Sequence, residues 1–314
     1  MGRIKRIEYR HSHGEATLKP EAASQKFDLT RLADGLFKVK LNQGRGFFKI
    51  GVEKKPGEAN SFFLEINGSR KFEIGNDCDT CHFWFKCLHE PRLARKVVNL
   101  SKAFQVPRPL DETMVQELGP ILELQEKGEF EVFETSSMVT GPYDSEDEGS
   151  YFFNSDFMDL WDVADPREEG LLSGWEHYES QRPRVFRHPE SNVVETQYDF
   201  FIPLVPRGLL KDENVKVYQS MIANGDRPRV LLLGLYQRAI PEVVRRGRGK
   251  TLHSFFAGFV LDGHHKLAAY RRAGVPAKFL VILSQKASKY FLLRDEGVSP
   301  RPKFEERLAA LAAS

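Results

Sequence analysis

The chain has 314 residues, of which 41% are hydrophobic and 29% are charged, a composition typical of globular proteins and not of disordered chains. Its length suits about two domains, each with a core large enough to fold without disulfide bonds. The formal net charge of +2 excludes a global field that would draw the protein to nucleic acid or to an anionic membrane, so any anion recognition must come from a local cluster.

Targeting signals do not stand out in this sequence. The first ten residues are basic but lead into no apolar core of the kind that a signal peptide has. No apolar run approaches the roughly 18 residues of a membrane span. All three cysteines lie within one short segment, whereas a secreted disulfide framework spreads them through the fold. We therefore expect a cytoplasmic protein with no membrane partner.

The overall prediction is an α+β protein whose N-terminal half is rich in β-structure. Residues 1–30 are polar without a sustained period, and we expect a flexible arm. Residues 31–150 are expected to form a β-rich domain, an antiparallel β-meander with helices. One helix is predicted to begin at the capping residue Asp111 and to end at Leu122, with a kink at Pro120.

Two hairpins are predicted at the start of that domain. The first joins residues 36–41 to residues 47–52, and both stretches alternate apolar and polar side chains. The second joins residues 61–66 to residues 71–74 through Asn67-Gly68, a pair that adopts positive φ readily and is the strongest short hairpin signal in the chain. The pattern predicts four antiparallel strands that lead directly into the cysteines.

The C-terminal half is predicted to alternate strands with helices. Residues 151–193 are aromatic but interrupted by prolines and glycines, and we interpret them as an aromatic linker. Residues 194–290 are expected to form an α/β domain, and residues 291–314 a helical tail. The predicted elements of this α/β domain are strands at residues 198–205, 230–235, 257–261 and 278–283 and helices at residues 212–223 and 264–273.

The cysteine cluster suits a structural zinc site. Cys78, Cys81, Cys87 and His89 supply three thiolates and one imidazole from one short segment, with His82 as an alternative to His89. Two other interpretations stay open. Aromatic residues between the cysteines are typical of a buried helix with reduced core thiols, and Cys-x-x-Cys is also a redox motif.

The sequence Asp262-Gly263 ends a predicted strand and leads at once into a helix. Such a turn presents unpaired backbone amides at the positive end of the helix dipole, and His264, His265 and Lys266 add donors in the first turn. Phosphate is the ligand that this chemistry favours. Ordinary capping by Asp262, with exposed first-turn side chains, explains the same residues equally well.

A basic, glycine-containing loop precedes this turn and includes Arg245, Arg246 and Arg248. If the strands on either side of the loop are neighbours, it folds over the same strand end as Asp262-Gly263 and clamps phosphates. A solvated basic loop and a nucleic-acid-binding surface are the alternatives.

The segment from Phe259 to Ile282 resembles the central motif of the ParB/sulfiredoxin-like superfamily, in which a strand ends in a turn that holds nucleotide phosphates. The resemblance covers about residues 195–290. It is nearest to the free-serine kinase-like branch, whose turn reads Asp-Gly-His-Thr-Arg. Asp262, Gly263 and His264 match that turn, while His265 replaces Thr and Lys266 replaces Arg.

Two other branches of the superfamily fit less well. Sulfiredoxins place a reactive cysteine where this chain has His264, so we do not expect sulfinyl reduction. Chromosome-partitioning ParB proteins use a different turn and continue into a helix-turn-helix domain, which we do not expect in the short stretch after Leu283.

The resemblance implies a nucleotide-binding protein with Mg²⁺, either a phosphotransferase such as an ATP- or ADP-dependent kinase or an NTP hydrolase. Asp262 and His264 are the expected catalytic residues, and Glu195 and Asp199 are further candidate carboxylates. The residues expected to contact the nucleotide are Gly263, His264, His265, Lys266, Arg245, Arg246 and Arg248. The alternative function is a non-catalytic nucleic-acid-binding or regulatory module.

Overall fold

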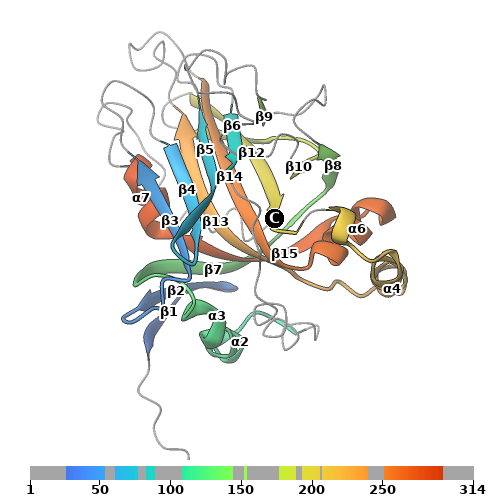
Figure 1. The fold of residues 1–314 in the computed structure, drawn as a ribbon, viewed down its shortest axis with the longest axis horizontal. Helices are drawn as coiled ribbons and strands as arrows, with labels where there is room; N and C mark the ends of the chain where they lie inside the picture. The colour runs from blue at the N-terminus through green and yellow to red at the C-terminus, as the bar shows by residue number, and fades with distance from the viewer. Residues whose placement is uncertain are drawn as a thin grey trace, which may run out of the picture.

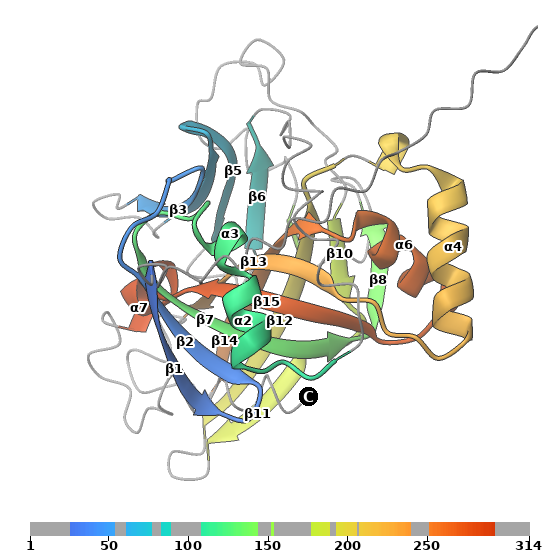
Figure 2. The same ribbon diagram turned by 90° about the horizontal axis from the view of Figure 1, so that it is seen from below.

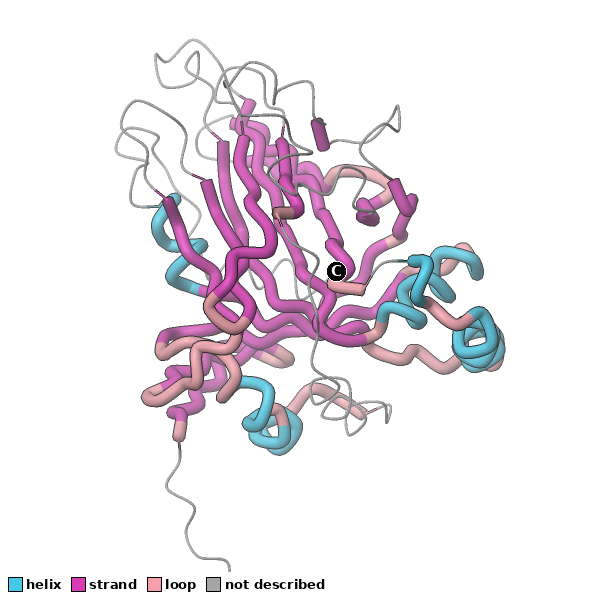
Figure 3. Tube along the Cα trace, in the orientation of Figure 1, coloured by secondary structure: helices cyan, strands magenta, loops and turns pink. Residues whose placement is uncertain are grey.

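The computed structural model describes residues 26–53, 61–76, 83–88, 108–143, 152–153, 177–188, 193–205, 207–239 and 251–292. Within these residues the protein is a mixed α/β fold built on a ten-stranded sheet and a five-stranded sheet (Figures 1 and 3). No helix in these ranges is long and apolar enough to cross a membrane.

The elements have the following bounds. The strands of the large sheet are β1 (Phe27–Ala33), β2 (Leu36–Leu41), β7 (Gly128–Ser137), β8 (Val139–Tyr143), β10 (His177–Ser180), β11 (Arg184–His188), β12 (Val193–Pro203), β13 (Val230–Ala239), β14 (Thr251–Asp262) and β15 (Ala277–Ser284). The strands of the small sheet are β3 (Phe48–Glu53), β4 (Ser61–Ile66), β5 (Ser69–Asn76), β6 (Phe83–Cys87) and β9 (Phe152–Phe153). The helices are α2 (Glu112–Glu117), α3 (Gly119–Leu122), the 3₁₀ helix η4 (Arg207–Leu209), α4 (Asp212–Ala223), α6 (His264–Ala273) and α7 (Gln285–Leu292).

The large sheet is strongly curled, because β8 at one end of its strand order is connected directly to β7 near the other end. Its strand order is β1-β2-β7-β15-β13-β14-β12-β10-β8, and β11 pairs with β12. Only Met138 separates the end of β7 from the start of β8, the last strand in this order, so the sheet must bend round to bring both together (Figure 2). The ring of Phe201 on β12 also stacks on Phe279 of β15, with the centroids 4.3 Å apart, although two strands separate them in the sheet.

The enclosed side of the curled sheet is its inner face, and side chains pack closely there against two glycines. Its core includes Leu232 and Phe256, which lie on neighbouring strands. A Cβ atom on Gly258 would lie 2.8 Å from Leu232 Cδ1, and a Cβ atom on Gly234 would lie 2.7 Å from the Phe256 ring. Larger residues at these two positions would therefore displace the side chains that fill the curl.

The opposite, outer face of the large sheet packs against the small sheet. Phe72 on β5 and Phe259 on β14 are both fully buried, and their ring centroids lie 5.7 Å apart. The same core includes Met114 and Leu118 from the α2 region. Since successive residues of β14 point to opposite faces, one strand supplies side chains to both cores.

Of the two predicted hairpins, the first is wrong and the second is confirmed. β2 and β3 cover the strands of the first, but β2 pairs with β1 and β7, whereas β3 pairs with β4 in the other sheet. Alternation fixes the face that a strand buries but does not identify its neighbour, which is why the pattern misled. β4 and β5 pair as expected, and Asn67 (φ 52°) and Gly68 (φ 74°) adopt the positive φ that their turn needs.

Strand pairing also crosses the expected boundary between the two halves. β7, from the predicted β-rich domain, pairs antiparallel with β15, from the predicted α/β domain, along the whole of β15. β8 of the first half likewise pairs with β10. The strands of residues 194–290 therefore belong to a sheet that they share with the N-terminal half.

The predicted helices agree closely with the structure. Asp111 caps α2, because its Oδ1 accepts a hydrogen bond from Met114 N at 2.8 Å, and Pro120 stands at the start of a separate short helix, α3. α4 and α6 have the predicted bounds. Within α4, Val215 and Ile222 are buried in the core, whereas Val217 is 57% exposed.

Several sequence predictions fall outside the described residues. They concern residues 1–25 of the arm, most of the linker, the tail from residue 293, and the ligand candidates Cys78, Cys81, His82 and His89. The structure gives only the backbone of Cys87, at the end of β6. The zinc site stays a prediction.

Candidate functional site

The Asp262-Gly263 turn has the backbone geometry that the sequence indicates, but the capping residue differs. Gly263 is itself the N-cap of α6, with a φ of 98°, and the helix has no side-chain cap. A Cβ atom at this position would lie 3.0 Å from Val230 Cα, so both the left-handed conformation and the close approach to β13 require glycine. Asp262 does not cap the helix.

The two histidines after Gly263 accept hydrogen bonds from the backbone of the segment that joins β12 to α4. His264 is buried, and its Nε2 accepts a hydrogen bond from Leu204 N at 3.1 Å. His265 is partly exposed, and its Nε2 accepts from Lys211 N at 3.1 Å. Burial lowers the pKa of His264 to about 4, although the Asp262 carboxylate acts in the opposite direction, and burial also lowers the pKa of His265. Both rings are therefore neutral acceptors near pH 7.

Lys266 is buried beneath the same turn. Its Nζ donates to Asp262 Oδ2 and to the carbonyl oxygen of Arg229, each at 2.9 Å. The ammonium also lies 5.8 Å from the centroid of the Tyr218 ring on α4. The side chain is only 3% exposed, so Lys266 ties α6 to the start of β13 and points away from solvent.

The expected phosphate site thus contains fewer available donors than the sequence indicates. Asp262, His264, His265 and Lys266 lie together, as predicted, but each has a partner inside the protein. The backbone amides of the first turn of α6 are the donors that remain for an anion. Whether nucleotide binds at this turn stays a prediction.

The other expected partners of this turn are not brought to it. β12 runs parallel to β14, and the register sets Asp199 beside Phe256, six residues before Asp262. At about 3.3 Å per residue this separates the two carboxylates by roughly 20 Å along the sheet. Glu195 lies farther along β12, where it accepts a hydrogen bond from the Tyr236 hydroxyl. Neither carboxylate shares a site with Asp262.

The basic loop starts from the wrong end of the sheet for a clamp. β13 and β14 are antiparallel neighbours, as the clamp requires, but Ala239 and Thr251, which flank residues 240–250, lie at the end of this strand pair remote from Asp262. Arg245, Arg246 and Arg248 lie outside the described residues. Since the strand pair extends for roughly 30 Å, the connection does not support a contact of these arginines with the turn.

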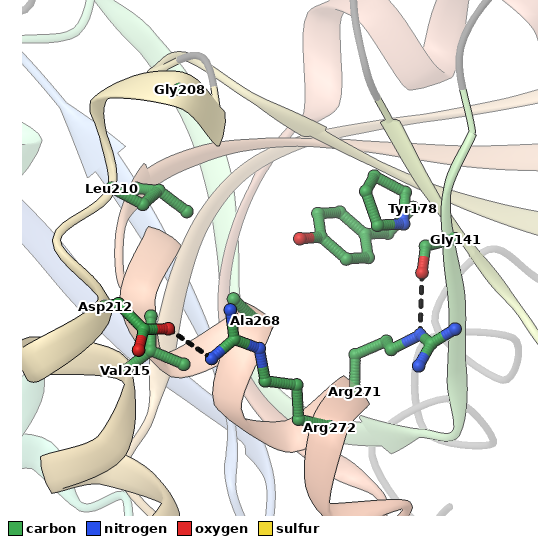
Figure 4. A pocket seen from close by; sticks show the side chains of 10 residues that line it. Gly141, Tyr178, Gly208, Leu210, Asp212, Val215, Ala268, Arg271 and Arg272 are labelled. Atoms are coloured by element: carbon green, nitrogen blue, oxygen red, sulfur yellow. Dashed lines mark hydrogen bonds and ion pairs between the residues drawn. The ribbon is translucent and has the colours of Figure 1, made fainter.

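A cavity of about 730 Å³ lies beside α6, between α4 and the strands β8 and β10 (Figure 4). The wall from α6 consists of Ala268, Arg271 and Arg272, which follow His264 by one to two helical turns. Tyr178 on β10 faces this wall, and its ring provides an apolar surface. The size is within the range of pockets that hold small molecules in proteins, roughly 300–1,000 Å³.

The two arginines of this cavity differ in their partners. Arg272 Nη1 donates to Asp212 Oδ1 at 2.6 Å, and Asp212 also pairs with Lys216 at 3.0 Å. Arg271 Nε donates to the carbonyl oxygen of Gly141 at 2.7 Å, which fixes its guanidinium against β8. Among the residues that the structure describes, Arg271 has no carboxylate partner. Its two terminal nitrogens are therefore available to an anion.

Sequence reasoning missed this cavity. Arg271 and Arg272 are part of the motif that carries the resemblance, but basic residues in the last turn of a helix normally serve the helix dipole, and nothing in the local pattern sets them apart. Tyr178 lies in the stretch interpreted as a linker. Only the curl of the large sheet brings β8 and β10 against α6.

A metal site is not evident in the part of the chain described here, where no three His, Cys, Asp or Glu side chains gather to hold an ion. Comparison with protein-family models, curated proteins and solved structures found no match for this chain.

Proposed function

We propose that the protein binds a nucleotide or a closely related phosphorylated small molecule in the cavity between α4, α6, β8 and β10. The observation that carries this proposal is Arg271, a guanidinium held in place by Gly141 and without a carboxylate partner among the described residues. Two parallel N–H groups of such a fork match the oxygens of a phosphate. The described lining carries two arginines against one aspartate, which favours an anion.

The position of the cavity supports a nucleotide in particular. The superfamily that the motif resembles holds nucleotide phosphates at the turn that begins this same helix. The cavity lies along α6 from that turn, and Tyr178 supplies a flat surface against which a ring can pack. A phosphate on Arg271 and a base near Tyr178 would occupy the cavity from both sides.

The proposal is for binding and assigns no residue to a chemical step. Asp262 is paired with Lys266, and His264 is a neutral acceptor whose Nε2 already receives the Leu204 amide. A general base needs a free lone pair within reach of the proton that it removes. This arrangement favours the non-catalytic alternative over the phosphotransferase or hydrolase.

Titration calorimetry with ATP, ADP and CTP, each with Mg²⁺, tests the proposal. We expect the parent protein to bind at least one of them and Arg271→Gln to bind it roughly ten- to a hundredfold more weakly, since a charge-assisted contact contributes about 1.5–3 kcal/mol. Arg31→Gln is the matched control, because Arg31 is an exposed arginine that pairs with Asp34 on another part of the sheet. Absence of binding at millimolar nucleotide, or equal affinity in both variants, would refute the proposal. Release of inorganic phosphate in the same mixtures would instead establish turnover.

A further inference from the structure

A second cavity, of about 440 Å³, lies where the curled sheet closes. It is bounded by the end of β7, with Ser136 and Ser137, by the segment that joins β10 to β11, with Arg182, and by the start of β11, with Arg184. Gln181 N donates to the carbonyl oxygen of Met138 at 2.8 Å and so joins the two sides. The described lining carries two arginines, hydroxyl and amide groups, and no acidic side chain. Its charge is opposite to that of an oxyanion.

Arg184 forms a rigid side of this cavity. Its Nε donates to Asp199 Oδ2 at 2.9 Å, and its Nη2 donates to Thr135 Oγ1 at 3.3 Å and to the carbonyl oxygen of Ser136 at 3.1 Å. These bonds reach across the curl from β11 to β12 and β7. A guanidinium fixed in this way is positioned before a ligand arrives, so little side-chain entropy is lost on binding.

Behind Arg184 the inner face carries polar side chains, in contrast to its apolar core around Leu232 and Phe256. Gln197 donates to Asp199 Oδ1 at 2.6 Å, which orients the carboxylate that holds Arg184. Gln197 Oε1 and Ser254 Oγ, on residues that are directly paired across β12 and β14, are buried and have no hydrogen-bond partner within the described ranges. Each unsatisfied buried group costs about 1–3 kcal/mol, and apolar side chains of similar volume stabilise a core better than a buried ion pair does. Polar residues at this cost favour a binding role over a packing role.

Arg182 differs from Arg184 in having no partner among the described residues. It is exposed at the mouth of the cavity, two positions before Arg184. Ser136 and Ser137 line the same cavity as the exposed guanidinium of Arg182 and the fixed guanidinium of Arg184. Two cations of this kind, one rigid and one adaptable, suit a ligand whose negative charge is concentrated on a small group.

We infer that this cavity is a second binding site, separate from the one beside α6, for a small molecule that carries a phosphate or a carboxylate group. The ligand oxygens lie between Arg182 and Arg184, with the serine hydroxyls as further donors. The limited volume and a lining whose charged side chains are both arginines select a compact anion over a nucleotide. Phe186 at the edge of the cavity bounds the part of the ligand that is not charged.

Calorimetric titration with inorganic phosphate and, separately, with succinate tests this inference. The titrations use the full chain carrying Arg271→Gln, which removes from the α6 cavity the arginine that the described residues leave without a carboxylate partner, so that the two sites are judged independently. We expect one of the two probes to bind and its affinity to fall at least tenfold when Arg182→Gln is added. The probe that binds more tightly identifies phosphate or carboxylate as the recognised group.

Arg182→Gln is chosen because the side chain is exposed, whereas changes at Arg184 would break its buried pair with Asp199 and weaken the fold. Arg31→Gln in the same background is the control and should leave the affinity unchanged. The inference is overturned if neither probe binds at millimolar concentration, or if the Arg182 and Arg31 variants bind equally well. Neither result bears on nucleotide binding in the α6 cavity, which is tested separately on the chain without these substitutions.

Discussion

Acidification should destabilise the protein through His264. The ring is buried and neutral, and its Nε2 must stay deprotonated to accept the hydrogen bond from Leu204 N. Burial lowers its pKa from 6.5 to about 4 in the folded chain. Because the folded pKa lies below the unfolded one, the stability that this group contributes is complete above about pH 6.5 and is lost as the pH falls toward 4.

The size of the effect follows from the two pKa values. Between pH 7.5 and pH 5 the unfolded chain takes up most of one proton at this histidine, while the folded chain takes up little. Linkage then gives a loss of about 2 kcal/mol in the free energy of unfolding, from His264 alone. The full shift corresponds to about 3 kcal/mol below pH 4.

Urea denaturation of the parent and of His264→Gln at pH 7.5 and pH 5 measures this contribution. Glutamine retains an oxygen that can accept from Leu204 N but does not titrate, so the variant should lose about 2 kcal/mol less than the parent does on acidification. His265→Gln is the control, because His265 is only partly buried and should account for a smaller difference. If the parent and His264→Gln show the same pH dependence, the ring is not held neutral by burial and the reasoning is refuted.

Two further predictions concern Lys266 and the cysteine cluster. Lys266→Met should lower the free energy of unfolding by about 3–5 kcal/mol, because it leaves the largely buried Asp262 carboxylate without its cation. Lys266→Met combined with Asp262→Asn should cost less than the single change in the same denaturation assay. For the predicted zinc site, metal analysis of protein purified without chelator should give about one equivalent, and Cys78→Ser should lower both the metal content and the thermal stability. A metal-free parent, or a Cys78→Ser variant of unchanged stability, would leave the thiol or redox interpretations.

Local elements could be predicted from this sequence because each depends on neighbours in the chain. The cap at Asp111, the turn at Asn67-Gly68 and the bounds of α4 and α6 all follow from a few adjacent residues. The pairing of strands depends on residues far apart. The sequence of β2 predicts one strand of a hairpin with β3, but β2 pairs instead with β7, an equally apolar strand that begins at Gly128.

The candidate site shows the same division. The left-handed conformation of Gly263 could be predicted, because strand-to-helix turns of this kind need a residue with positive φ. The burial of Lys266 could not be predicted, since a lysine in the first turn of a helix is normally exposed. Besides the Asp262 carboxylate, the Arg229 carbonyl oxygen and the Tyr218 ring make a buried ammonium acceptable here, and both come from outside α6. The cavity beside Arg271 needed β8 and β10, whose places in the sheet no local pattern fixes.

During synthesis, β7 cannot pair with β15 until the residues between the two strands have been made. About 140 residues separate the two strands, and at roughly 5–20 residues per second a ribosome needs from about 7 to 30 seconds to deliver β15 after β7 has emerged. During that time β7 has β2 on one side and an open hydrogen-bonding edge on the other, where another nascent chain could pair. Glu129, Glu131 and Glu134 place charge along this strand, and like charges facing each other oppose such pairing until the proper neighbour arrives.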